Sequence, residues 1–255
     1  MSQPTSDERP VALVTGASGG IGAASAAGLA EDGFDIVVTA RDKVTLAKTL
    51  GRIEAVGGQA LALNLDVRNL EQIAQCFDDA IARFGHVDVL VNNAGVPTPR
   101  NPIVDTSPED WDTIMDINVK GAFFVAREFA RRLIEQKRPG QVINFSSTFS
   151  YIGMPNVCVY GISKTAMGGM TRMMAIEWAE HGIRANAVAP GATATEGRRD
   201  AFSNPVFIEK IRAGVPMGRV GEPDEVASAI RYLASPGAAY VNGHSLVIDG
   251  GFIVK

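Results

Sequence analysis

A short apolar run at residues 11–14 leads directly into the glycine-rich stretch TGASGGIG at residues 15–22. Four consecutive apolar residues are typical of a buried parallel strand, and the pattern that follows predicts a helix over about 21–32, ended by Gly33. A strand, a glycine-rich turn and a helix in this order expose backbone N–H groups and the positive end of the helix dipole. The stretch therefore predicts a site for the phosphates of a dinucleotide, and an ordinary glycine-rich turn is the alternative.

Three glycines of this turn have distinct expected roles. Gly16 permits the tight turn, Gly20 lets the phosphates approach closely, and Gly22 lets the helix pack tightly. The spacing Gly-x-x-x-Gly-x-Gly differs from the commoner dinucleotide fingerprint Gly-x-Gly-x-x-Gly. The turn therefore indicates a phosphate site without belonging to that common fingerprint.

Strand and helix patterns alternate along the rest of the chain. Further strands are expected at residues 36–39, 60–65, 87–91, 141–145, 184–188 and 246–248, and helices near 42–56, 69–84, 109–136, 157–181 and 222–234. This alternation predicts an α/β fold: a doubly wound parallel sheet of about seven strands with helices on both faces and ligands at the carboxyl ends of the strands. Without an internal repeat or linker, we expect one domain over 11–255 and a flexible tail at 1–10.

Composition excludes several classes of partner. The 255 residues include 24 basic and 28 acidic side chains, so the net charge of −4 gives no footprint for nucleic acid or for an anionic membrane. The first ten residues are polar, and no apolar run approaches the roughly 20 residues that span a bilayer. The sequence predicts a cytoplasmic protein.

Cysteine and histidine contribute little chemistry. Cys76 and Cys158 are too few and too far apart for a disulfide framework, so both are expected to be free thiols in packed positions. His86, His181 and His244 lack metal-ligand spacing and are interpreted as surface or turn residues. No metal site is expected.

The segment STFSYIGMPNVCVYGISK at 147–164 brings together a hydroxyl, a phenol and an ammonium group. Tyr160 and Lys164 are four residues apart and share one face of the predicted helix. A tyrosine with a reference pKa near ~10 transfers protons poorly at neutral pH, but an adjacent lysine cation favours the phenolate. Ser147 follows a strand, where its hydroxyl can hold a substrate oxygen. The alternative is a packed ring and a solvated amine on one helix.

The chain resembles the short-chain dehydrogenase/reductase family over residues 11–252. The TGASGGIG stretch resembles that family's cofactor loop, and its other motifs are matched in order by Asn92-Asn93-Ala94-Gly95, Asn118, Ser147, Tyr160 and Lys164. The resemblance implies a Rossmann-like fold, a nicotinamide cofactor and a homotetramer in which the helices at 109–136 and 157–181 pack between subunits. Gly168 and Gly169 in the latter helix predict close approach of another backbone. The tail at 216–251 resembles 3-oxoacyl-acyl-carrier-protein reductases and several sugar and polyol dehydrogenases.

The resemblance also implies roles for individual residues. Asn118 would be a fourth catalytic residue that breaks its helix and helps a water link Lys164 to solvent; the alternative is a polar residue on a half-buried helix face. Asp66 is also open to interpretation as a helix cap. The implied cofactor contacts are Gly16, Ser18, Gly20, Ile21, Gly22, Arg41, Asp66, Val67, Asn93, Ala94, Gly95, Tyr160, Lys164, Pro190, Gly191, Thr193 and Thr195, the last on the nicotinamide carboxamide.

The end of the second strand bears on the choice of cofactor. A carboxylate there would bind the adenosine ribose and repel a 2′-phosphate, whereas an arginine attracts the phosphate. This chain has Ala40 and Arg41, which favours NADP(H). Against this preference, Gly19 stands where many NADP-dependent relatives carry a second basic residue, and Asp42 follows directly, so NAD(H) stays possible.

The predicted activity is an NADP(H)-dependent carbonyl reductase that transfers hydride between nicotinamide and a ketone or secondary alcohol. Alternatives are a sugar, sugar-acid or polyol dehydrogenase using NAD(H) and, more remotely, a non-enzymatic dinucleotide sensor. The expected substrate pocket is lined by Val96, Thr98, Phe149, Tyr151 and Met154, under a substrate loop at 196–216. These residues suit a fatty 3-oxoacyl thioester, a keto-sugar acid or a small cyclic ketone.

Overall fold

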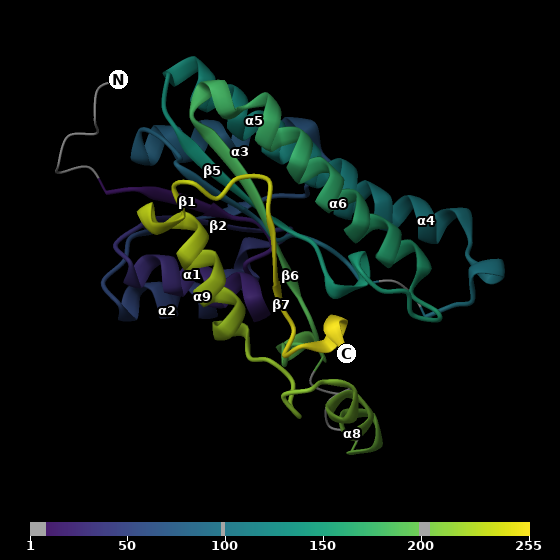
Figure 1. The fold of residues 1–255 in the computed structure, drawn as a ribbon. Coiled ribbons are helices and arrows are strands. Elements are labelled where there is room, and N and C mark those ends of the chain that lie inside the picture. The colour runs from purple at the N-terminus through teal and green to yellow at the C-terminus, as the bar shows by residue number, and fades with distance from the viewer. Residues whose placement is uncertain (1–8, 98–99, 199–204) are drawn as a thin grey trace.

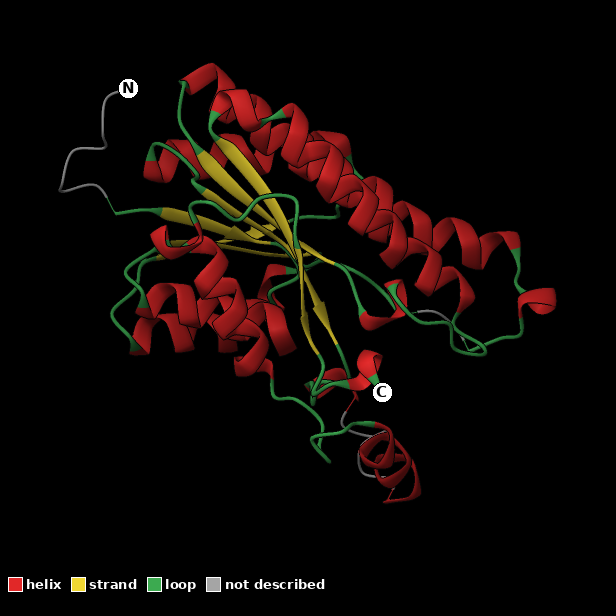
Figure 2. Ribbon diagram, viewed as in Figure 1, coloured by secondary structure: helices red, strands yellow, loops and turns green. Residues whose placement is uncertain are grey.

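The computed structural model describes residues 9–97, 100–198 and 205–255. Within these residues one seven-stranded parallel sheet runs in the order β3-β2-β1-β4-β5-β6-β7 (Figure 2). Its strands are β1 (Val11–Val14), β2 (Asp35–Ala40), β3 (Ala60–Asn64), β4 (Val89–Asn92), β5 (Gly140–Phe145), β6 (Ile183–Pro190) and β7 (Ser245–Ile248). The predicted Rossmann-like, single-domain α/β fold is confirmed.

Helices cover both faces of the sheet (Figure 1). They are α1 (Gly20–Glu31), α2 (Ala47–Ala55), α3 (Leu70–Phe84), α4 (Pro108–Met115), α5 (Ala122–Gln136), α6 (Cys158–Glu177), α8 (Pro205–Gly214) and α9 (Pro223–Ala234). Helices α1, α2 and α9 lie on one face, and α3, α5 and α6 lie on the other. Helix α8 projects from the end of the molecule that also holds the C-terminus.

Two apolar layers fill the space between the sheet and these helices. Phe77 of α3 and Phe129 of α5 pack together under one face, with their ring centroids 6.3 Å apart. Leu29, Ile53 and Ile230, from α1, α2 and α9, pack under the other face. Because both faces are covered, β1 is apolar and buried throughout rather than alternating.

The order of the strands determines where a ligand site can form. The chain moves outward from β1 to β2 and β3, then returns to the other side of β1 with β4. Leu13 of β1 consequently pairs with Val37 on one side and Leu90 on the other. The chain continues from β1 into α1 on one face of the sheet and from β4 towards α5 on the other face. Connections that diverge in this way open a crevice at the carboxyl ends of β1 and β4.

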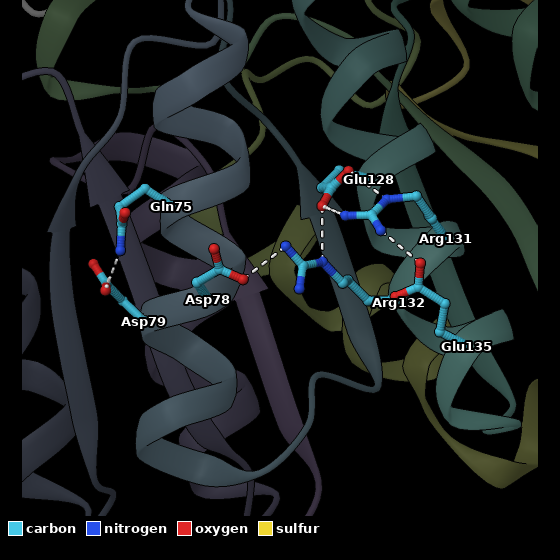
Figure 3. Close-up of polar contacts among 7 residues, drawn as sticks. All are labelled: Gln75, Asp78, Asp79, Glu128, Arg131, Arg132 and Glu135. Atoms are coloured by element: carbon cyan, nitrogen blue, oxygen red, sulfur yellow. Dashed lines mark hydrogen bonds and ion pairs between the residues drawn. The ribbon is translucent and has the colours of Figure 1, made fainter.

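A polar network joins α5 to its neighbour α3 (Figure 3). Glu128 of α5 is buried and accepts hydrogen bonds from Arg131 and Arg132, and Arg132 also contacts Asp78 of α3 at 2.7 Å. Burial alone would raise the pKa of Glu128, but the bonds from the two arginines outweigh it and lower that pKa. The buried carboxylate is therefore paired, which is the condition for tolerating it inside the fold.

Several helix boundaries differ from the sequence prediction. The single helix expected at 109–136 is α4, a π-helical segment at Asp116–Gly121 and then α5. The one expected near 42–56 begins as a 3₁₀ helix at Lys43–Leu46, whose first turn is capped by Asp42. Residues 1–8 of the predicted tail lie outside the described residues.

The surface prediction for His86 needs correction, whereas the prediction for the paired glycines stays a prediction. His86 is buried rather than at the surface, and its Nε2 lies 3.0 Å from the carboxylate of Asp88, just before β4. A Cβ added at Gly168 or Gly169 would find its nearest described neighbour in the Arg172 guanidinium, at 3.7 and 4.0 Å respectively. Within one chain, no backbone atom of another described segment therefore lies within 4 Å of either added Cβ.

The two cysteines are free thiols that differ in burial. Cys76 is buried, and this burial raises the pKa of its thiol to about 12. Cys158 is half-buried. Across the described ranges, no cluster of side chains could hold a metal ion, and no helix is long and apolar enough to cross a membrane.

Candidate active site

The glycine turn between β1 and α1 is held by side chains from the end of β4. Asn93 donates hydrogen bonds to the carbonyl oxygens of Thr15 and Gly16, both at 2.9 Å, and Thr15 Oγ1 accepts one from the backbone N–H of Ala94. Gly16 has φ +65°, a left-handed conformation that favours glycine. A Cβ on Gly22 would stand 2.6 Å from both Asn93 Nδ2 and the Gly16 oxygen. The motif residues therefore shape one tight cradle.

The N-terminal end of α1 opens into this cradle. Gly19 caps the helix without a side-chain hydrogen bond, and the first turn carries no acidic residue. The first N–H groups of a helix have no partner inside the helix, and they attract anions together with the helix dipole. The cradle thus fits the diphosphate of a dinucleotide, and the predicted contacts Gly16, Ser18, Gly20, Ile21 and Gly22 all belong to this turn and the first turn of α1.

Gly22→Ala is expected to lower the free energy of unfolding by about 1–3 kcal/mol, because the added methyl group must displace Asn93 or the turn. It should also weaken NADPH binding. Gly51→Ala is the matched control, since that helical glycine has nothing within 4 Å and the change should be neutral or slightly stabilising. Urea unfolding and NADPH titration of both variants provide the measurement, and equal behaviour would contradict this account of the turn.

The residues expected to contact the adenosine part of the cofactor lie at the ends of β2 and β3. Arg41 is exposed there. Asp66 accepts a hydrogen bond from the Arg68 side chain, which holds the pKa of Asp66 below its usual value. The capping interpretation of Asp66 is wrong for α3, because Asn69 caps that helix. Val67 packs against Gly121, where a Cβ would come within 2.7 Å of it.

Ser147, Tyr160 and Lys164 come together at the carboxyl end of β5. Ser147 caps the 3₁₀ helix Thr148–Ser150, and its Oγ accepts from the N–H of Phe149 at 3.3 Å. Lys164 is buried, its Nζ donates to the Phe145 carbonyl at 2.9 Å, and it lies 5.6 Å from the ring centroid of Tyr160. Burial lowers the pKa of Lys164 to about 8. The lysine is a fixed group in the interior, not a solvated amine.

Asn118 occupies the π-helical segment between α4 and α5. Its Oδ1 accepts from the N–H of Val96 at 2.8 Å, and its Nδ2 donates to the Val96 carbonyl at 3.0 Å and to Ser163 Oγ at 3.2 Å. The expected local break of the helix is present, and π-helical segments occur frequently at functional sites. The amide ties the loop after β4 to α6.

Two serines at the site had no assigned role in the sequence prediction. Ser163 lies on the same helix face as Tyr160 and Lys164, and its Oγ donates to the Tyr160 carbonyl at 2.7 Å. Ser146 donates to the Lys164 carbonyl at 3.1 Å and thereby joins the end of β5 to α6. The one signal in the sequence for these roles is that each serine adjoins a predicted catalytic residue.

The segment after β6 closes the crevice from the other side. Pro190 ends the strand, and the N–H of Gly191 donates to the Ile248 carbonyl at 2.9 Å. Thr193 is buried. Thr195 packs against the glycine turn, with its methyl carbon 3.1 Å from where a Cβ on Gly20 would stand. Thr195 thus reaches the cradle from a distant part of the chain.

The predicted substrate residues are only partly brought together. Phe149, Tyr151 and Met154 line a cavity of about 920 Å³ that Ile103 and Ile162 also border. The ring of Phe149 meets that of Tyr160 edge to face, with centroids 6.2 Å apart. Val96 lies instead at Asn118, where its backbone bonds the amide. Thr98 lies outside the described residues, as do residues 199–204 of the predicted loop at 196–216.

Comparison with known proteins agrees with this architecture. The family model described as Enoyl-(Acyl carrier protein) reductase matches residues 16–253. The 2-dehydro-3-deoxy-D-gluconate 5-dehydrogenase of Escherichia coli (strain K12) is 38% identical over 97% of both chains, and the 3-oxoacyl-[acyl-carrier-protein] reductase of Synechocystis is 37% identical over 96% of this chain and 97% of its own. The solved gluconate 5-dehydrogenase of Burkholderia cenocepacia J2315, in complex with NADP and tartrate, has a TM-score of 0.91 and 36% identity, covering 97% of this chain and 96% of that one. This chain belongs to the short-chain dehydrogenase/reductase family of oxidoreductases.

Proposed function

We propose that this protein is an NADP(H)-dependent oxidoreductase that interconverts a ketone and a secondary alcohol. The observation that carries the proposal is the placement of Ser147, Tyr160 and buried Lys164 at the end of β5, next to the glycine cradle. A carbonyl oxygen in this place would be within reach of a hydroxyl and of a phenol that can donate its proton. A dinucleotide sensor would have no need of this group of side chains.

Each side chain has a separate task in the proposed reaction. The nicotinamide supplies the hydride when the cofactor is bound. Ser147 orients the carbonyl oxygen, and Tyr160 gives that oxygen a proton. The cation of Lys164, fixed by the Phe145 carbonyl, favours the phenolate that this transfer leaves. Asn118 holds the adjoining loop against Ser163 of α6, the helix that carries Tyr160 and Lys164.

Arg41→Ala is expected to reduce the preference for NADPH over NADH by about ten- to a hundredfold. A charge-assisted contact with the 2′-phosphate contributes about 1.5–3 kcal/mol, and this contact would be lost. The measurement is kcat/KM for both cofactors in each protein. Arg52→Ala is the control, because it removes an exposed cation of α2 whose surface pair with Asp224 contributes little. An unchanged ratio in Arg41→Ala would refute the assignment.

The substrate class has two candidates. Among the described residues that line the cavity beside Tyr160, none is charged, which favours an uncharged arm such as that of a 3-oxoacyl thioester. The relatives that act on sugar acids favour a polar keto acid instead. A panel of 3-oxoacyl thioesters, keto-sugar acids and small ketones, assayed with both cofactors, separates the two. The class with the higher kcat/KM is the substrate class.

A homotetramer is the proposed assembly. Large apolar side chains stay exposed on α5 and α6 in the single chain, among them Phe123, Ile162, Met173 and Ile176. Contiguous exposed apolar surface is typical of protein interfaces. Light scattering gives the mass of the assembly directly, and a monomer in solution would refute this proposal.

A further inference from the structure

A carboxylate from a distant segment lies over the mouth of the glycine cradle. Glu196 begins the 3₁₀ helix Glu196–Arg198 directly after Thr195, which packs on Gly20. Its Oε2 lies 3.7 Å from where a Cβ on Gly19 would stand. Its Oε1 lies 3.9 Å from Lys48 Nζ. The acidic side chain therefore borders the space that the absent side chain of residue 19 leaves open.

The position of this carboxylate matters because Gly19 caps α1. The partial positive charge at the helix N-terminus attracts a side-chain anion just as it attracts a phosphate. The first turn of α1 contains no acidic residue of its own, so Glu196 brings the negative charge from outside the helix. A dinucleotide diphosphate bound at this helix N-terminus would carry the same sign of charge as the nearby carboxylate.

We propose that Glu196 is a negative charge at the edge of the diphosphate site that opposes binding of the cofactor. The side chain stabilises the mouth of the cradle in the free protein and repels the phosphates in the complex. It weakens cofactor binding and accelerates cofactor release. The inference rests on the proposed cofactor site.

Glu196→Gln is the decisive variant, because it keeps the size and hydrogen-bonding capacity of the side chain while it removes the charge. The dissociation constants for NADPH and NADH should both fall about two- to fivefold at low salt, as expected for one charge at a helix terminus. Release of either cofactor in stopped-flow fluorescence should slow by a similar factor. At about 0.5 M salt the variant and the parent should bind the cofactors almost equally, because salt screens the charge of Glu196.

Glu54→Gln serves as the matched control. Glu54 is exposed on α2, and its substitution changes the net charge by the same amount. Its cofactor dissociation constants should equal those of the parent, which separates a local effect of Glu196 from a general change in charge.

Each outcome bears on a defined part of the inference. Unchanged or weaker binding by Glu196→Gln would overturn it, because a merely structural glutamate would not oppose the cofactor. Tighter binding confined to NADPH would overturn the assignment to the diphosphate, which both cofactors share. If the parent bound neither cofactor, the proposed function itself would fail, and the inference with it.

Discussion

Tyr160→Phe should reduce turnover of the best ketone by about 10²–10⁴-fold, while the protein folds and binds its cofactor as before. The substitution keeps the ring that meets Phe149 edge to face and removes only the hydroxyl that transfers the proton. Loss of a positioned acid or base costs a factor of this size. The measurement combines kcat in both reaction directions with NADPH titration and urea unfolding.

Tyr151→Phe provides a control for this experiment. Tyr151 is a half-exposed tyrosine of the adjacent loop, and removing its hydroxyl should alter kcat far less. A Tyr160→Phe enzyme with near-parental kcat would be incompatible with the proposed mechanism. The tyrosine would then be a packing residue of α6.

Lys164→Met should abolish most activity and at the same time stabilise the cofactor-free protein at neutral pH. Burial lowers the pKa of Lys164 from 10.5 to about 8, so the unfolded chain holds this proton more firmly than the folded one. The free energy of unfolding of the parent should therefore rise between about pH 8 and pH 10.5. The rise attributable to this group is about 3 kcal/mol at most.

The variant lacks the titrating amine. The difference in free energy of unfolding between the two proteins therefore isolates the contribution of this group. At about pH 7 we expect Lys164→Met to be the more stable protein, and this advantage should shrink as the pH approaches 10.5. The measurement is urea unfolding of both cofactor-free proteins across this range. If stability depended on pH in the same way in both proteins, or if the variant were less stable at every pH, burial of the ammonium group would not destabilise the fold.

The parts of the site that depend on local sequence were predictable. The glycine turn follows from the positions of Gly16, Gly20 and Gly22, because a tight turn and a missing Cβ are local requirements. The shared helix face of Tyr160 and Lys164 follows from their spacing. Both features involve residues that are neighbours along the chain.

Features that depend on tertiary packing were not predictable in the same way. Helix spacing puts Lys164 on the face of Tyr160 but does not say that the lysine is buried, which requires the end of β5 to cover it. His86 is buried beside Asp88, whose carboxylate accepts from the N–H of Val11 and from Arg138, and these distant partners arrive only when the sheet forms. Glu196 meets Gly19 from across the chain, a contact that no periodicity shows.

Isotope transfer tests the central claim most directly. The parent enzyme is supplied with NADPH deuterated on the transferred face of nicotinamide C4 and with the best ketone of the panel, and the alcohol is examined by mass spectrometry and NMR. The account predicts one deuterium on the carbinol carbon of the product and none on its oxygen after exchange with water. An alcohol without deuterium on that carbon, with either face of the nicotinamide labelled, would contradict hydride transfer by this protein.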